Sequence, residues 1–306
     1  VLAGLAMLAL AAWYFFAGRQ PGVPSSTAGR ETVAAAAAYV GSKACAQCHA
    51  AESKAWQASQ HAVAMQHATE QTVLGDFNDA DYSFQGIQSS FFQRDGKYFI
   101  RTDGPDGKLA DFEVKYSFGV APLQQYLVEL PGGRLQAVSV TWDSRPREEG
   151  GQRWFRQYPT EQLDHTDELH WTRRAQNWNF MCADCHSTRV TKGYDAESDS
   201  FKTTYAEISV GCEACHGPGS AHIEWAGRKG AEAGKGLTVQ LDERRGVTWG
   251  RDAGTGRPVR NRPRATEREI EVCAQCHARR AQIAEGYVPG RPFMDHYLPS
   301  LLVPGL

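Results

Sequence analysis

The chain of 306 residues holds 33 Lys and Arg against 35 Asp and Glu, which gives a formal net charge of −2, and 42% of its residues are hydrophobic. This composition is typical of a globular protein with one or two domains. It argues against a nucleic-acid-binding protein, which normally concentrates basic residues on one surface. We therefore expect no nucleic acid among its partners.

Residues 1–17 are uncharged and mostly apolar, and they are just long enough for a short membrane span. Ala9-Leu10-Ala11 resembles a signal-peptidase site, but the apolar run continues to Phe16. The sequence therefore favours an uncleaved membrane anchor, with a cleaved signal or a buried helix as the alternatives. Either export interpretation places the following residues in the periplasm or elsewhere outside the cytoplasm.

The next segment, residues 18–38, is rich in Gly, Pro, Ser and Ala and predicts a flexible linker. Residues 39–306 are predicted to form one domain, described below. The chain begins without Met and ends on an apolar stretch, so we expect it to be a fragment of a longer protein.

One five-residue pattern, Cys-x-x-Cys-His, occurs four times in this domain and uses all eight cysteines of the chain. The copies are Cys45, Cys48 and His49; Cys182, Cys185 and His186; Cys212, Cys215 and His216; and Cys273, Cys276 and His277. In this pattern the two thiols add to the vinyl groups of haem as thioethers, and the histidine binds the iron. The sequence therefore predicts four covalently attached c-type haems.

Zinc sites, thioredoxin-like redox pairs and disulfides are the alternatives for these cysteines. None of the three requires a histidine directly after every second cysteine. Four porphyrins would also supply large apolar surfaces, so we expect a haem-cored domain that needs few Leu and Ile of its own. Each haem brings two propionates, and we expect arginines near them.

Between motifs one and two the sequence pattern changes from that of a helix to that of β-strands. Residues 50–69 are predicted to form a helix with His61 and Met65 on one face. Further on, Ser90-Phe91-Phe92 and Tyr98-Phe99-Ile100 flank Asp95-Gly96, a pattern typical of a β-hairpin.

More turns and a strand follow this hairpin. Gly104-Pro105-Asp106-Gly107 and Pro131-Gly132-Gly133 predict turns, and Leu135–Trp142 alternates as a strand does. We therefore expect an antiparallel β insert over about residues 84–142. The predicted fold class is α+β with much irregular structure, in which this insert lies between haem motifs one and two.

The second half of the chain is rich in aromatic residues and arginines. Residues 154–180 hold aromatic side chains that suit packing against porphyrin rings or in an ordinary core, and the sequence leaves both open. A short helix carrying His222 and Trp225 follows motif three. Residues 227–268 are predicted as an exposed excursion, and motif four lies in a predicted helix, Glu267–Ile283.

Several stretches together resemble a known family. They are Tyr39-Val40-Gly41-Ser42, Ser59-Gln60-His61-Ala62 with Met65, Tyr116-Ser117-Phe118-Gly119-Val120, Leu123-Gln124-Gln125-Tyr126-Leu127, Asn177-Trp178-Asn179, and the run from Gly211 through motif three to His222. From Tyr39 to its end the chain resembles the multihaem c-type cytochromes related to the tetrahaem electron acceptor of hydroxylamine oxidoreductase. Members are often fused to tetratricopeptide repeats, and they typically continue with further haem motifs.

Beyond the four motif histidines, which bind iron from one side, six histidines remain for the second axial positions. His61, His170, His222 and His296 lie in apolar surroundings and are the predicted ligands. His67 and His165 lie in polar runs and are expected to be solvated. Met65 is a possible sulfur ligand, but with a nitrogen donor four residues earlier we interpret it as packing.

His222 follows His216 by only six residues, so we expect it to ligate a neighbouring haem rather than the haem of motif three. With both axial positions filled by protein, haems exchange electrons and offer substrates no open site. Electron transfer with redox protein partners is therefore the favoured function. The alternatives are a reductase of a small nitrogen or sulfur oxide that uses one open iron, and a haem-filled scaffold.

Overall fold

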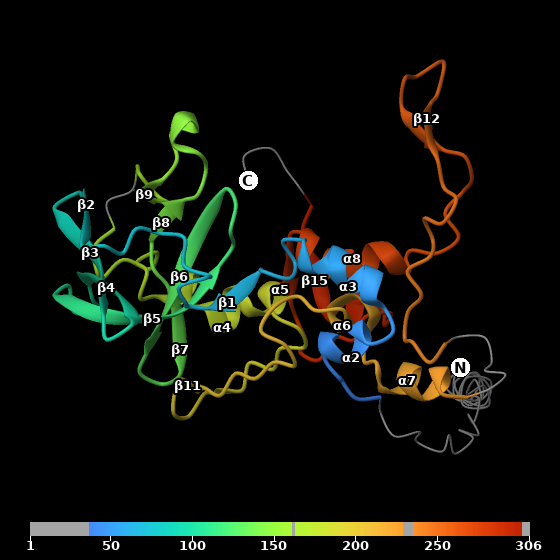
Figure 1. Ribbon diagram of the computed structural model, residues 1–306, viewed down its shortest axis with the longest axis horizontal. Helices are drawn as coiled ribbons and strands as arrows, with labels where there is room; N and C mark the ends of the chain where they lie inside the picture. Colours follow the sequence, from blue (N-terminus) through green and yellow to red (C-terminus); the bar gives the residue numbers. More distant parts are fainter. Residues whose placement is uncertain (1–36, 161–162, 229–234, 302–306) are drawn as a thin grey trace, which may run out of the picture. The chain divides into compact units, whose positions relative to one another are not determined.

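The computed structural model describes residues 37–160, 163–228 and 235–301 (Figure 1). The predicted anchor over residues 1–17 and most of the predicted linker lie outside this part of the chain. Within it, the fold mixes one large antiparallel sheet with short helices and turns, as the sequence predicted at this coarse level. No helix in the described ranges is both long enough and apolar enough to cross a membrane.

The large sheet has nine strands in the described residues, drawn from cyan to green in Figure 1. They are β1 (Met65–His67), β2 (Ala80–Phe84), β3 (Ile87–Arg94), β4 (Lys97–Asp103), β5 (Leu109–Phe118), β6 (Leu123–Leu130), β7 (Arg134–Ala137), β8 (Val140–Asp143) and β9 (Arg153–Arg156). The spatial order is β2-β3-β4-β5-β6-β8-β9, with β1 paired to β5 and β7 paired to β6. The sheet is therefore larger at both ends than the predicted range of residues 84–142.

The predicted hairpin at Asp95-Gly96 is confirmed. Arg94 pairs with Lys97 across it, and Asp95 and Gly96 both adopt positive φ, at 53° and 72°. A two-residue turn of this kind matches the twist of its strands, and Gly or Asp tolerates the conformation. The turns at residues 104–107 and 131–133 also lie between consecutive strands.

The helix predicted over residues 50–69 is too long. α3 ends at Gln57, and the amide and hydroxyl of Ser59 both donate to the carbonyl of Trp56, which closes the helix. Met65 then lies in β1, fully buried, and pairs with Phe118. His61 and Met65 therefore do not share a helix face, because burial of Met65 in the sheet outweighs local helical spacing.

The strand predicted over residues 135–142 is broken into β7 and β8. The amide of Val138, which lies between them, donates to the carbonyl of Tyr126. Residues 136–143 are all buried, so both faces of this stretch pack against protein. An alternating pattern cannot show where such a doubly buried segment changes partner.

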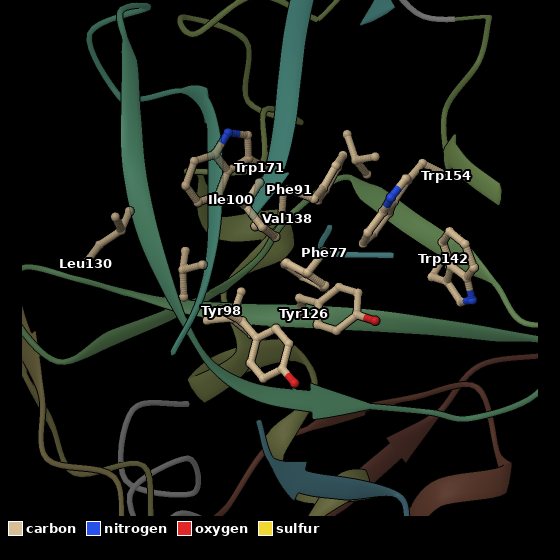
Figure 2. Packing of buried hydrophobic residues seen from close by; sticks show 13 residues of the cluster. Phe77, Phe91, Tyr98, Ile100, Tyr126, Leu130, Val138, Trp142, Trp154 and Trp171 are labelled. Carbon is tan, nitrogen blue, oxygen red and sulfur yellow. The ribbon is translucent and has the colours of Figure 1, made fainter. Parts of the chain in front are cut away.

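The sheet encloses a core of large aromatic side chains (Figure 2). Its members are Phe77, Phe91, Tyr98, Ile100, Val114, Tyr126, Val128, Leu130, Val138, Val140, Trp142, Trp154 and Trp171. Phe91 and Trp154 stack with ring centres 3.6 Å apart, and the ring of Phe77 meets Trp154 edge-on at 5.4 Å. Trp154 and Trp171 thus belong to an ordinary core, one of the two interpretations left open.

The remaining segments form short elements. The helices are α2 (Ser42–Ala46), α3 (Ala50–Gln57), α4 (Trp178–Met181), α5 (Ala183–His186), α6 (Glu213–His216), α7 (Ser220–Ala226) and α8 (Arg268–His277), with 3₁₀ turns η1 (Arg147–Glu149), η2 (Arg174–Gln176) and η3 (Phe293–Asp295). Three two-stranded sheets join β10 (Tyr194–Asp195) to β11 (Ser200–Phe201), β12 (Trp249–Arg251) to β13 (Pro258–Arg260), and β14 (Arg280–Gln282) to β15 (Tyr297–Pro299). The helix predicted to reach Ile283 therefore ends at His277.

Candidate haem-attachment sites

The four Cys-x-x-Cys-His motifs lie on or directly beside the short helices α2, α5, α6 and α8. In the first three motifs the histidine amide donates to the carbonyl of the first cysteine, over 3.0 Å for His49, 3.1 Å for His186 and 3.0 Å for His216. This single helical turn holds two thiols and an imidazole at one end of a short segment, as attachment to one porphyrin edge requires.

The motifs approach one another through their cysteines, none of which forms a disulfide. The thiols of Cys45 and Cys212 are hydrogen-bond neighbours, which joins motif one to motif three. Cys215 lies within electrostatic reach of Cys273, which joins motif three to motif four.

Motif four in turn meets motif two. The thiols of Cys185 and Cys276 are hydrogen-bond neighbours, and the thiol of Cys276 also faces the carbonyl of Cys185 at 3.9 Å. The four motifs therefore form a continuous series in the order one, three, four, two. This order differs from their order in the sequence.

Motifs one and three are held together by Glu213, which lies between the two cysteines of motif three and is 1% exposed. Its carboxylate accepts the backbone N–H groups of Val40 at 2.9 Å, Gly41 at 2.7 Å and Gly219 at 2.7 Å. A buried carboxylate is stable only when such donors replace its water. Val40 and Gly41 directly precede motif one, so Glu213 fixes that segment to motif three.

Motifs two and four are held by a second carboxylate. Asp184, which lies between the cysteines of motif two, accepts from Arg280 Nη2 at 2.6 Å and from the hydroxyl of Tyr297 at 2.9 Å. Arg280 follows motif four and also donates from Nε to the carbonyl of Gln275, inside that motif, at 2.8 Å. Burial, reinforced by the charge of Asp184, raises the pKa of Tyr297, so its phenol stays protonated and donates.

The sequence analysis missed both carboxylates, although their positions carried a signal. Motifs one and four have Ala-Gln between their cysteines, whereas motifs two and three have an acidic residue there. In both cases the carboxylate accepts hydrogen bonds from residues next to another motif. Each acidic motif therefore joins to one of the two neutral motifs.

Two pairs of histidine rings come close together. The ring centres of His49 and His222 are 6.0 Å apart, and those of His61 and His277 are 6.2 Å apart. Two imidazoles bound to opposite sides of one metal, at about 2 Å from metal to nitrogen, have centres roughly 6 Å apart. The separation of the ring centres in both pairs is therefore the one that two imidazoles on a shared iron would have. The interplanar angles of 26° and 87° are both compatible with such a pair, because two rings on one metal can take any angle to each other.

His222 is also oriented for such a role. Its Nδ1 donates to the backbone carbonyl of Lys235 at 2.6 Å, so Nε2 is the nitrogen available to a metal. A hydrogen bond of this kind fixes the tautomer and the ring orientation of a metal-binding histidine. His222 lies on α7, the short helix that the sequence predicted.

His186 has a similar hydrogen bond at Nδ1, but the ring beside it is not an imidazole. Its Nδ1 faces the carbonyl of Ala64 at 2.9 Å, and the ring in contact with it is that of Phe118, edge-on at 5.2 Å. Burial lowers the pKa of His186, and burial together with His222 and His49 lowers the pKa of His216. Both imidazoles are therefore held in the neutral form that binds metals.

The structure places His170 elsewhere, in the core of the large sheet. It is fully buried, its Nε2 donates to Asp103 at 2.9 Å, and its Nδ1 accepts from the hydroxyl of Thr172 at 2.8 Å. Both ring nitrogens are thus occupied, and His170 is not retained in the ligand set proposed below. The apolar residues beside His170 in the sequence correctly indicated that it is buried. They did not indicate which residues surround it.

The other candidates divide as follows. His296 is half-buried beside Tyr287, with its Nδ1 at 3.3 Å from the carbonyl of Ala284, which leaves Nε2 free. His67 is exposed, as expected, and His165 is half-buried. The sulfur of Met65 accepts from the hydroxyl of Ser187 at 3.7 Å inside a hydrophobic cluster, which agrees with packing.

The segments that carry the motifs fit haem for a second reason. Apart from the core of the sheet and the cluster around Met65 and Trp178, the described residues form one small buried cluster of Tyr287, Phe293 and Tyr297. Few apolar side chains therefore stabilise these helices against one another, and porphyrins would add the missing apolar surface.

Zinc fits less well than haem. In the described part of the chain no three His, Cys, Asp or Glu side chains converge as a structural zinc site requires. Thioether formation, in contrast, needs only that each pair of sulfurs meets one porphyrin.

Comparison with known proteins agrees with this interpretation. A family model described as cytochrome c554 and c-prime matches residues 44–83 and 142–217, which include motifs one to three. The fold is similar to that of the outer cell wall cytochrome OcwA, with a TM-score of 0.51 and 19% sequence identity. The family match supports a c-type cytochrome with covalently bound haem, and the similarity to OcwA shows a shared fold. The narrower resemblance, to the electron acceptor of hydroxylamine oxidoreductase, stays a prediction.

The similarity to OcwA covers 86% of this chain but 45% of OcwA, so this chain spans less than half of that protein's length. No curated protein matches the chain.

Proposed function

We propose that the protein transfers electrons through four c-type haems, one at each Cys-x-x-Cys-His motif. The observation that carries this proposal is the proximity of the motifs' cysteines in the order one, three, four, two. Because the attachment cysteines of successive motifs lie near one another, porphyrins bound to them would also lie near one another. An electron that enters at either end of the series then passes to the other end through neighbouring haems.

In this proposal His49, His186, His216 and His277 bind the four irons from one side. His222 completes the iron of motif one, and His61 completes the iron of motif four, on the strength of their ring separations of 6.0 and 6.2 Å. The function of His222 would then be to link motifs one and three, since its helix directly follows motif three. His296 remains a proposed ligand for one of the other two irons.

We also propose an extracytoplasmic location, since c-type haems are attached outside the cytoplasm and the similar protein OcwA is named for the outer cell wall. The predicted anchor at residues 1–17 would bind the membrane. If it does, the protein should fractionate with membranes, and deletion of this segment behind a cleavable signal should give a soluble product that carries haem.

The proposal is tested by expressing the chain with a c-type haem attachment system and measuring its intact mass under denaturing conditions. We expect the apoprotein mass plus four haems. Variants with both cysteines of one motif replaced by Ala should each lose one haem. A colourless chain that contains zinc would overturn the proposal.

A second function, reduction of a small nitrogen or sulfur oxide, rests on the surroundings of His186. His49 and His277 each face a second imidazole, whereas the ring that contacts His186 is that of Phe118. An iron bound by His186 alone would keep one open position. Cyanide or carbon monoxide binding by one quarter of the haem in the unaltered protein would favour this function over simple electron transfer.

A further inference from the structure

The segment before α8 forms an arm that ends in the hairpin β12–β13, where Trp249 pairs with Arg260. The sequence predicted this region as exposed, and most of it is. Arg260 differs from its neighbours because its side chain is only 11% exposed. Burying a guanidinium is costly unless anionic partners surround it, so the position of Arg260 needs a reason.

Arg260 borders a cavity of about 420 Å³ between the arm and α8. The helix contributes Ile270, Cys273, Ala274 and His277, which lie on one face at spacings of three and four residues. The cavity therefore begins at one attachment cysteine and the iron-binding histidine of motif four. It extends along α8 towards the helix N-terminus, under the arm.

The charges around this cavity are incompletely paired. Nη2 of Arg260 donates to Glu243 at 2.9 Å, but its Nη1 is buried without a hydrogen-bond partner in the described part of the chain. A buried donor without a partner is unfavourable, so we expect Arg260 to find an acceptor when the neighbouring cavity is filled.

The cavity as a whole also favours an anion. Arg244, Arg260 and Arg264 line it against Glu243 and Glu269, an excess of one positive charge among the lining residues, and Arg264 also pairs with Glu267 at 2.9 Å outside this lining. Glu269 contacts Arg244, and the second carboxylate oxygen of Glu269 is buried without a hydrogen-bond partner in the described part of the chain. A ligand in the cavity would therefore lie beside the carboxylate of Glu269. A ligand with carboxylates at one end and an apolar body at the other fits these walls.

A haem attached through its vinyl groups at Cys273 and Cys276 carries its two propionates on the far side of the ring. We propose that Arg260 binds a propionate of this haem and that the β12–β13 arm closes the site. The pairing is a charge-assisted hydrogen bond to a carboxylate, for which the planar guanidinium is well suited. This inference rests on the proposed function, because it requires haem at motif four.

The test compares haem reduction potentials of the holoprotein in Arg260→Gln and Glu243→Gln variants by spectroelectrochemistry. Removing the cation beside a propionate leaves negative charge uncompensated, which favours ferric iron. In Arg260→Gln one of the four potentials should fall, by roughly the 59 mV that corresponds to a tenfold change in a one-electron equilibrium. In Glu243→Gln the same potential should rise, because Arg260 loses its competing carboxylate.

The opposite signs separate a charge effect from damage to the arm, which would move both variants in the same direction. Arg260→Lys keeps the charge and should stay nearer the wild-type potential than Arg260→Gln does. Arg257→Gln is the matched control, since Arg257 is exposed on the same arm and does not border the cavity. It should leave all four potentials unchanged.

Four attached haems with potentials in Arg260→Gln equal to those of the Arg257→Gln control would overturn the role of Arg260 and leave electron transfer intact. Shifts of the same sign in Arg260→Gln and Glu243→Gln would overturn it too. Loss of haem from the unaltered protein would instead contradict the proposed function itself.

Discussion

The imidazole of His222 lies with its ring centre 6.0 Å from that of His49, although the two residues belong to segments far apart in the sequence. Its Nδ1 is held by the carbonyl of Lys235, so Nε2 is the free nitrogen. This arrangement places the imidazole of His222 beside that of motif one, as the proposed ligation of the motif-one iron by His222 requires.

We predict that His222→Ala opens one iron while all four haems stay covalently attached. One quarter of the haem should become high-spin and gain affinity for cyanide, since a nitrogen donor is lost. Low-temperature electron paramagnetic resonance of the oxidised protein measures this. His67→Ala is the control because His67 is exposed. A variant that stays fully low-spin, with unchanged potentials, would show that His222 is no ligand.

The motifs lie next to one another in the order one, three, four, two. This order predicts which haem connects the others. Removal of the haem at motif four (Cys273→Ala with Cys276→Ala) should separate haem two from haems one and three. Removal of the haem at motif one should leave the other three connected. Intramolecular electron equilibration after rapid partial reduction should therefore slow markedly in the first variant only, among proteins that retain three haems. Equal slowing in both variants would rule out this order.

Glu213 is predicted to hold motifs one and three together. Glu213→Ala leaves the amides of Val40, Gly41 and Gly219 without their acceptor, which costs about 1–3 kcal/mol for the buried amide of Gly219 and less for the two partly buried ones. We expect a clearly lower Tm and a weaker magnetic interaction between two haems. Glu213→Gln keeps one acceptor oxygen and should recover part of both.

The control for this prediction is Glu224→Gln, because Glu224 is exposed and its ion pair with Arg228, at 3.5 Å, is exposed as well. Exposed pairs contribute about 0–1 kcal/mol, so Tm should hardly change. If Glu213→Ala lowers Tm but leaves the interaction between haems intact, Glu213 stabilises the fold without positioning the haems.

Asp103 and His170 predict a pH dependence that belongs to the sheet and not to the haems. Burial raises the pKa of Asp103, but hydrogen bonds from His170 and Thr102 lower it more, so the net pKa lies below its usual value. A carboxyl with a lowered folded-state pKa adds stability above its unfolded pKa of about 3.9, and this is lost as the pH falls through the folded value. The free-energy difference between wild type and Asp103→Asn should therefore shrink below about pH 4.

Urea unfolding followed by circular dichroism measures this difference. His170→Ala should destabilise the sheet by about 3–5 kcal/mol, because it leaves a buried carboxylate without its partner. Haem spectra should stay the same in both variants. A change of haem spin state in His170→Ala would restore His170 as a ligand and contradict its placement in the core.

Local signals in the sequence were sufficient where local chemistry decides the structure. Asp95-Gly96 specified its hairpin because its two residues tolerate positive φ, and the Cys-x-x-Cys-His spacing specified one helical turn. The helix predicted through Met65 failed because pairing with Phe118, distant in sequence, decides its conformation. The same limit explains His170, whose apolar flanks gave burial but not its partner Asp103.

The assembly of the motifs could not be predicted, because it depends on contacts between segments far apart in the chain. Tertiary packing alone brings Cys185 to Cys276. It also brings Asp184 to Arg280, with which Asp184 forms an ion pair. The acidic residues inside motifs two and three were visible in the sequence, but not which motif each would meet. The buried position of Arg260 was likewise hidden within a run that is polar and rich in glycine.

The measurement that tests the central claim most directly is a coulometric redox titration of the purified holoprotein, followed by its visible spectrum. The account predicts that each chain takes up four electrons, one for each Cys-x-x-Cys-His motif, and returns all of them on oxidation without loss of haem. An uptake of fewer than four electrons per chain, or haem that cannot be reoxidised, would contradict it.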